Sequence, residues 1–322
     1  MTCAAKPAAI AAQAQEPDME KIRFKNRNGA DITMAAIIHF PTGFDSSRQY
    51  PAVVVTHPGG GVKEQTAGLY ASKLAEQGFV SIAFDASYQG ESTGEPRQLE
   101  DPHVRTQDIS AVIDHLTTLP YVDRERIGAM GICAGAGYTA NAAINDRRIK
   151  AVGTVSAVNI GSMFRNGWDN NVKSADAISL LEHGSQARTT EAGGAGTVTI
   201  PLAPLRKEDA PNQELEEAWE YYHTPRARHP TAPGFATARS LNQIITYDAY
   251  SMADVFLTQP LQIVAGSEAG SKWMSDGLFH RAASQDKHFH VVEGASHMSL
   301  YDVPKYVDEA ISKLAPFFRS HL

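Results

Sequence analysis

The sequence has few cysteines, no long apolar run and no excess of basic residues. Cysteine occurs only as Cys3 and Cys133, which argues against a disulfide framework. No run reaches the roughly 18 apolar residues of a transmembrane helix, so we expect no membrane-spanning segment. Lysine and arginine total 29 against 36 aspartate and glutamate, a formal net charge of −7. Without a basic footprint, a nucleic acid or an anionic membrane is not the expected partner.

The remaining composition is that of a globular protein. The chain has 322 residues, 43% of them hydrophobic and 20% charged. These proportions exclude a disordered, collagen-like or coiled-coil chain, and the length allows one large domain with an insertion or two domains.

Residues 1–18 are set apart by their alanine- and glutamine-rich composition. The triplet Ala12-Gln13-Ala14 resembles a signal-cleavage site, but Lys6 and Pro7 interrupt the apolar stretch that an export signal needs. We expect a disordered tail or a remnant signal here. The expected location is therefore cytoplasmic, with the periplasm as the alternative if the remnant acts as a signal.

Most of the chain alternates between short apolar runs and amphipathic segments. An opening hairpin is expected from Lys21–Lys25 and Ile32–Phe40. Further strands are predicted at Pro51–Thr56, Phe79–Asp85, Arg126–Ile132, Ile149–Val158, Leu261–Ala265 and His288–Val292. Helices are predicted at 64–77, Asp101–Leu119, 134–145, Lys272–Ala283 and Val303–Arg319. This alternation predicts an α/β fold with a mostly parallel sheet and helices on both faces.

The alternation breaks between residues 160 and 258. Loops with glycine and proline separate amphipathic pieces such as Glu214–His223 and Ala236–Tyr250, and Thr197–Ile200 is the one candidate for a short strand. We interpret 160–258 as a mostly helical cap, inserted into a core made of residues 19–159 and 259–322.

The sharpest motif is Gly131-Ile132-Cys133-Ala134-Gly135, between a predicted strand and a predicted helix. It is a nucleophile elbow with cysteine at the centre. The sharp turn leaves no room for side chains two residues before and after the centre, so both positions are glycine. The central side chain is exposed at a helix N-terminus, where the helix dipole favours a thiolate. The alternative is a buried cysteine in a tight turn.

A glycine-rich turn, His57-Pro58-Gly59-Gly60-Gly61, follows the strand that ends at Thr56. Backbone N–H groups at Gly59 or Gly60, together with the N–H of Ala134, could hold a developing oxyanion. A phosphate-binding loop is the competing interpretation. It is disfavoured because Val62-Lys63-Glu64 follows instead of Gly-Lys-Ser/Thr.

A general base and an orienting acid are expected from later loops. His297, in Gly294-Ala295-Ser296-His297 after the last predicted strand, is the best-placed of the 12 histidines. Glu268, in the loop after Leu261–Ala265, is the first candidate for the acid. Asp276, Asp85 and Glu91 are the alternatives.

Two further patterns have ordinary explanations. Gly135–Ala140 fits a dinucleotide-binding fingerprint formally, but Cys133 and Ala134 separate it from the strand. The aromatic residues of the insertion form either its core or a wall facing the substrate: Trp168, Trp219, Tyr221 and Tyr222.

With these motifs in place, the sequence resembles the α/β-hydrolase superfamily. The cysteine elbow is similar to that of dienelactone hydrolases, and three stretches resemble a bacterial dienelactone-hydrolase-like group of the YcjY type: His57–Gly68, Phe84–Arg97 and Gly131–Gly137. Related elbows occur among fungal polyketide transferases. The resemblance implies a mostly parallel sheet and hydrolase or acyl-transfer chemistry.

Two positions depart from this family pattern. Ala269 occupies the usual position of the acid, and Gly135-Ala136 replaces Gly-Gly.

The sequence therefore predicts a hydrolase of carboxylic esters, lactones or thioesters, with Cys133 as nucleophile and His297 as base. We expect a small-molecule substrate, no cofactor and no metal. An acyltransferase using the same site, or a non-catalytic binding protein, remains an alternative. The oligomeric state is open, a homodimer included.

Overall fold

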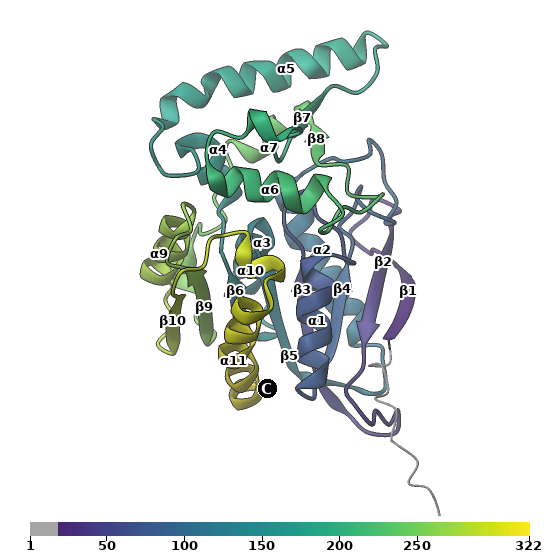
Figure 1. Cartoon of the computed structure of the whole chain (residues 1–322). Helices are drawn as coiled ribbons and strands as arrows, with labels where there is room; N and C mark the ends of the chain where they lie inside the picture. The colour runs from purple at the N-terminus through teal and green to yellow at the C-terminus, as the bar shows by residue number, and fades with distance from the viewer. Residues whose placement is uncertain (1–18) are drawn as a thin grey trace, which may run out of the picture.

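An eight-stranded sheet forms the centre of the protein (Figure 1). The computed structural model describes residues 19–322, so the prediction for residues 1–18 lies outside the described residues. The order of the strands is β1-β2-β4-β3-β5-β6-β9-β10. The strands are β1 (Met19–Lys25), β2 (Thr33–His39), β3 (Tyr50–Thr56), β4 (Val80–Phe84), β5 (Val122–Ile132), β6 (Ile149–Val155), β9 (Leu261–Gly266) and β10 (Lys287–Val292).

The sheet is parallel apart from β2, which pairs antiparallel with β1 and with β4. The opening hairpin, with Lys21 opposite Ile37, explains this reversal. The parallel pairs run from β4 through β3, β5, β6 and β9 to β10. The predicted fold class is confirmed.

Both faces of the sheet are buried along its central strands, which explains their continuous apolar runs. In β3, Ala52 and Val54 pack into one core, and Val53 and Val55 pack into the other. Side chains of α2 (Pro102–Leu116), α3 (Ala134–Asn145) and α9 (Lys272–Arg281) belong to the first core. The second core includes α1 (Thr66–Glu76) and α11 (Pro304–His321), which lie in front of the sheet in Figure 1.

The segment 160–258, called the inserted segment below, leaves the sheet after β6 and returns at β9. Figure 1 shows most of it stacked beyond one end of the sheet. Its helical elements are α4 (Ile160–Asn166), η1 (Ser174–Ala177), α5 (Ile178–Ala192), η2 (Lys207–Asp209), α6 (Gln213–His223), η3 (Ala238–Ser240), α7 (Leu241–Ile244) and α8 (Ala253–Phe256). A separate two-stranded sheet joins β7 (Thr199–Pro201) to β8 (Phe235–Thr237).

Within the inserted segment, the predicted piece Glu214–His223 forms helix α6. The piece Ala236–Tyr250 is divided among β8, η3 and the short helix α7. The assignment of this segment as a separate cap stays a prediction. In the part of the chain that the structure describes, no helix is long and apolar enough to cross a membrane.

Candidate active site

Cys133 lies at the turn from β5 into α3, with strained backbone angles of φ 57° and ψ −127°. The flanking glycines have a steric cause. A Cβ atom at Gly131 would lie 2.2 Å from the carbonyl oxygen of Gly135, and one at Gly135 would lie 2.3 Å from that of Thr56. Residues other than glycine are therefore excluded at both positions. The turn leaves the Cys133 side chain half-buried, beside a small cavity.

The loop after β3 lies beside this cysteine. A Cβ atom at Gly59 would be 3.7 Å from the Cβ of Ala134, so the two backbone segments are close neighbours. The backbone N–H groups of Gly59 and Ala134 donate hydrogen bonds toward the sulfur of Cys133 and favour its thiolate. Gly60 adopts a positive φ of 70° in the same loop. Sequence reasoning placed the oxyanion donors at Gly59, Gly60 and Ala134, and the structure brings Gly59 and Ala134 together at the sulfur.

His57 fixes the shape of this loop. Its Nε2 atom accepts a hydrogen bond from the backbone N–H of Ala86 (3.2 Å), so the Nδ1–H donates to the carbonyl oxygen of Pro58 (2.7 Å). Burial lowers the pKa of His57 well below its ordinary value, which keeps the ring neutral. The Nη2 atom of buried Arg105 donates to the carbonyl oxygen of His57 (2.6 Å). The loop is therefore held from the protein interior.

The imidazole of His297 is buried beside the cysteine. Its Nδ1 atom lies 2.6 Å from the hydroxyl of Ser271, and its Nε2 atom lies 3.1 Å from the hydroxyl of Tyr301. Burial lowers the pKa of His297 to about 3, because no carboxylate compensates the desolvation of an imidazolium. The resting imidazole is neutral at physiological pH.

None of the four carboxylates considered from the sequence reaches this imidazole. The side chain of Glu268 is exposed, accepts a hydrogen bond from Ser267 (3.3 Å) and does not line the cavity beside Cys133. Asp276 pairs with Lys272 (3.0 Å). Asp85 and Glu91 both pair with buried Lys63, at 2.8 and 2.7 Å. In place of an acid, the structure puts the neutral hydroxyl of Ser271 at Nδ1.

Ser271, Tyr301 and Glu214 were missed by the sequence reasoning. Tyr301 follows His297 by four residues and lies on the short helix α10 (Ser299–Asp302), a spacing that could have indicated it. Ser271 lies within the loop in which an acid was expected, and it was passed over because its side chain is a hydroxyl. Glu214 gave no signal, because only the tertiary fold brings α6 to the catalytic loops.

Glu214 ties the inserted segment to two loops of the sheet. One carboxylate oxygen accepts from the backbone N–H of His297 (2.8 Å), and the other accepts from the N–H of Gly270 (3.0 Å) and from the indole of Trp168 (2.5 Å). Burial raises the pKa of Glu214, and these three donors oppose the shift. A single carboxylate thus holds the loops that carry His297 and Ser271.

The cavity beside Cys133 is small and mostly apolar. Its volume is about 60 Å³. No side chain that is charged at neutral pH lines it. The lining residues are Gly59, Cys133, Ala134, Val158, Ile160, Met163, Trp168, Leu202, Ala203, Leu215, Ala218, Tyr222, His297, Met298 and Tyr301. The inserted segment supplies much of this wall.

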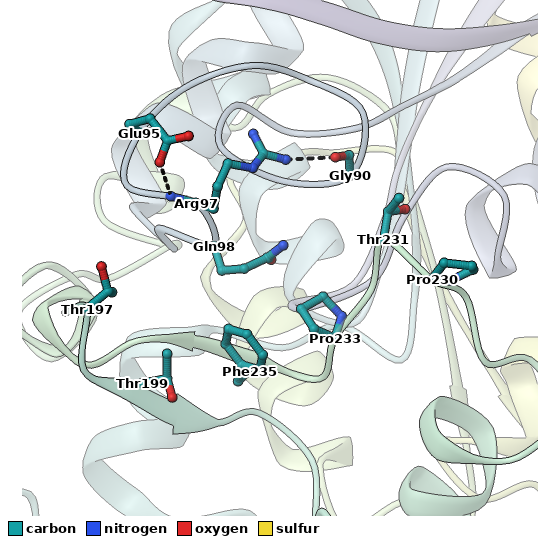
Figure 2. Close-up of a pocket in the computed structure, with 10 residues that line it drawn as sticks. All are labelled: Gly90, Glu95, Arg97, Gln98, Thr197, Thr199, Pro230, Thr231, Pro233 and Phe235. Atoms are coloured by element: carbon teal, nitrogen blue, oxygen red, sulfur yellow. Dashed lines mark hydrogen bonds between the residues drawn. The ribbon is translucent and has the colours of Figure 1, made fainter.

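A larger cavity of about 580 Å³ lies between the loop after β4 and the β7–β8 region (Figure 2). Its one arginine, Arg97, donates hydrogen bonds to the carbonyl oxygens of Gly90 (2.7 Å) and Ser92 (2.5 Å). None of the candidate catalytic residues lines this cavity. We therefore place the chemistry at the smaller cavity.

The environment of Cys133 favours a neutral thiol at rest. Burial raises the pKa of Cys133, while the hydroxyl of Tyr301 and the N–H groups of Ala134 and Gly59 oppose that shift. A thiol with a raised pKa next to an imidazole with a lowered one forms no resting ion pair.

The strand order, the elbow after β5 and the loop after the last strand together define an α/β hydrolase. The chain belongs to the dienelactone-hydrolase-like group of this superfamily, and the model of the dienelactone hydrolase family matches residues 34–157. The uncharacterized protein YcjY of Escherichia coli K12 is 70% identical over 302 residues, which cover 94% of this chain and 99% of the relative.

Two further relatives agree with this placement. The crystal structure of hypothetical protein PA2218 from Pseudomonas aeruginosa superposes with a TM-score of 0.87 at 32% identity, covering 96% of this chain and 95% of the other. A thiohydrolase of Eupenicillium brefeldianum is 21% identical over 280 residues, which cover 85% of this chain and 87% of the relative. The protein is an enzyme of the α/β-hydrolase type.

Proposed function

We propose that this enzyme cleaves a carboxylic ester, lactone or thioester through an acyl-enzyme formed on Cys133. The observation that carries the proposal is the position of this thiol. It projects from a strained elbow between two backbone N–H donors, those of Gly59 and Ala134. Such donors stabilise the oxyanion of a tetrahedral intermediate when a carbonyl carbon is attacked at this point.

The reaction has two halves. The proton of the Cys133 thiol passes to Nε2 of His297, and the sulfur bonds to the carbonyl carbon. The tetrahedral intermediate then expels the alcohol or thiol, which takes the proton from the imidazolium. Water, deprotonated by His297, attacks the resulting thioester and releases the acid and the free thiol.

The cavity favours an uncharged, apolar acyl group. An acyl carboxylate would be desolvated there without a cationic partner, because the lining side chains are apolar, aromatic or neutral. A thioester fits this chemistry, since a thiolate exchanges readily with another sulfur leaving group. The name of the thiohydrolase relative supports that class.

A pair of matched esters tests the proposal. p-Nitrophenyl butyrate presents an apolar acyl chain, and p-nitrophenyl hemisuccinate presents a similar chain that ends in a carboxylate. We expect turnover of the butyrate at least tenfold faster, because desolvation of the unpaired carboxylate is unfavourable by more than about 1.4 kcal/mol. The S-butyryl thioester of a small thiol should also be cleaved.

Cys133→Ala is the control for the nucleophile. The variant should lose about 10³-fold or more in kcat with an unchanged circular dichroism spectrum. Intact-mass spectrometry of wild type during turnover should detect one butyryl group, which is absent from the variant. Turnover by Cys133→Ala within tenfold of wild type would reject the proposal. Product analysis with an added alcohol distinguishes hydrolysis from acyl transfer.

A further inference from the structure

Tyr301 occupies an unusual place in this site, with its hydroxyl between the nucleophile and the base. The hydroxyl is 3.1 Å from Nε2 of His297. Tyr301 and Cys133 line the same small cavity, and the tyrosine hydroxyl opposes the rise in the pKa of the thiol. Among the described residues, the two ring nitrogens of His297 form hydrogen bonds with Ser271 and Tyr301, and not with Cys133. Tyr301 is thus a hydrogen-bond partner of the base that also lies at the cavity of the nucleophile.

The tyrosine is held firmly in this position. Its side chain is 1% exposed, and its ring packs edge-on against that of Tyr221, with centroids 5.1 Å apart. Its carbonyl oxygen accepts a hydrogen bond from the hydroxyl of Thr66 (3.0 Å), which ties α10 to α1. A ring buried and packed in this way keeps its hydroxyl at one point.

The hydrogen-bonding capacity of this hydroxyl matches its neighbours. A phenol has one donor and two acceptor positions. With the O–H donated to Nε2 of His297, the oxygen keeps two acceptor positions, and the thiol of Cys133 is a donor at the same cavity. Nδ1–H of the same imidazole then donates to Ser271. One tautomer of the imidazole satisfies both of its hydrogen bonds.

We propose that Tyr301 is a catalytic residue that relays the proton between Cys133 and His297. The proposal rests on the function proposed above. In the forward step the S–H bond breaks as the sulfur proton joins the tyrosine oxygen, while the phenol proton leaves that oxygen and bonds to Nε2. The tyrosine stays neutral overall, and the products are the thiolate and the imidazolium. The same steps run backward when a leaving group or the free thiol is protonated.

Burial raises the pKa of Tyr301 well above its ordinary value, so the phenol is protonated at rest and has a proton to donate. The other groups around the thiol are Tyr222, Tyr250 and Arg105, whose electrostatic effects involve the same cysteine. All three remain unchanged in the variants below.

Alkylation of Cys133 by iodoacetamide measures the relay without any substrate. Tyr301→Phe keeps the ring and removes the hydroxyl, and Tyr221→Phe removes the hydroxyl of the neighbouring ring, which binds the backbone N–H of Thr66 (2.9 Å). We expect Tyr301→Phe to raise the thiol pKa by about one unit, and to slow alkylation near pH 7 about tenfold. Tyr221→Phe should alkylate within twofold of wild type.

A double variant separates a relay from simple packing. In the relay, Tyr301→Phe and His297→Ala each interrupt the same path, so the double variant should alkylate no more slowly than the slower single variant. Multiplicative losses would overturn the relay. An unchanged pH profile, or faster labelling, in Tyr301→Phe would also overturn it, as would a wild-type thiol that reacts at no pH. Lack of turnover on every ester, with these alkylation results intact, would reject the proposed function and leave the relay standing.

Discussion

The sheet and the inserted segment differ in how they are built and in what they contribute to the site. Strands such as β3 bury side chains on both faces, whereas helix α5 of the inserted segment buries only Gly184 and Ala187. The loops after β3, β5, β9 and β10 carry Gly59, Cys133, Ser271 and His297. The inserted segment provides much of the cavity wall and Glu214. The proposed reacting groups thus lie on the sheet, and most of the wall proposed to contact substrate lies on the inserted segment.

This division has a physical reason. Catalytic geometry tolerates errors of well under about 1 Å, which buried strand ends and steric turns can provide. Selectivity depends on the shape and polarity of a wall, which can be altered without disturbing the sheet. Glu214 links the two regions, because its carboxylate accepts hydrogen bonds from the backbone N–H groups of His297 and Gly270 in the loops after β10 and β9.

The largest contrast is expected from alanine substitutions of glycine. In Gly135→Ala, the new Cβ would lie 2.3 Å from the carbonyl oxygen of Thr56 within the packed core. The free energy of unfolding should fall by about 3 kcal/mol or more, or the protein should fail to fold. Gly196→Ala in the inserted segment has nothing within 4 Å and should stay within about 0.5 kcal/mol of wild type. Urea denaturation measures both, and equal losses would contradict the contrast.

The pH dependence of stability tests the burial of His297. Its pKa is about 3 in the folded protein, against 6.5 for an ordinary histidine. Between these values the unfolded chain binds the proton and the folded chain does not, so stability falls as the pH falls. At pH 4.5, two units below the ordinary value, this loss is about 2–3 kcal/mol.

His297→Asn should remove that contribution. The free energy of unfolding of each protein is measured in urea at pH 7 and at pH 4.5. The loss between these two pH values should be about 2–3 kcal/mol smaller in the variant than in wild type. Buried His39 and His57 titrate in both proteins and cancel in the comparison. Parallel losses in the two proteins would show that His297 is protonated normally.

Glu214→Gln tests the link between the two regions. The amide keeps one acceptor oxygen but cannot serve all three donors as a carboxylate does. We expect kcat to fall about 10- to 100-fold through misplacement of His297, with KM changed less. Glu217→Gln is the matched control from the same helix, because the carboxylate of Glu217 accepts a hydrogen bond from the hydroxyl of Ser296. Its kcat should fall less than threefold. A reversed order would contradict the positioning role.

The smallest effects are expected at the position of the orienting group. Ser271→Ala removes the partner of Nδ1 and should lower kcat about tenfold, less than the loss of a triad carboxylate, because a neutral hydroxyl stabilises imidazolium weakly. The kcat of Glu268→Gln should stay within about twofold of wild type, since this exposed carboxylate accepts a hydrogen bond from Ser267 and does not line the cavity beside Cys133. A severe loss of kcat in Glu268→Gln would show that Glu268 is the orienting acid after all.

Much of the core was predictable from local patterns. The runs at Pro51–Thr56 and Ile149–Val158 are apolar because the strands are buried on both faces, and the predicted elements fall close to β3 and β6. The Gly-x-Cys-x-Gly spacing predicted the turn at Cys133 for the steric reason that the structure displays. The inserted segment was less readable, and Ala236–Tyr250 forms a strand and short helical turns, because long-range contacts outweigh its local amphipathic pattern.

The sequence alone determined the elbow, the glycine-rich loop and the candidacy of Cys133 and His297, since each depends on a short steric or spacing pattern. Only the tertiary structure decided which groups meet the imidazole. Chain position favoured Glu268 as the acid, whereas the fold places the hydroxyls of Ser271 and Tyr301 at the two ring nitrogens. Hydrogen-bond partners depend on side-chain direction across loops far apart in the chain, and no local pattern encodes that direction.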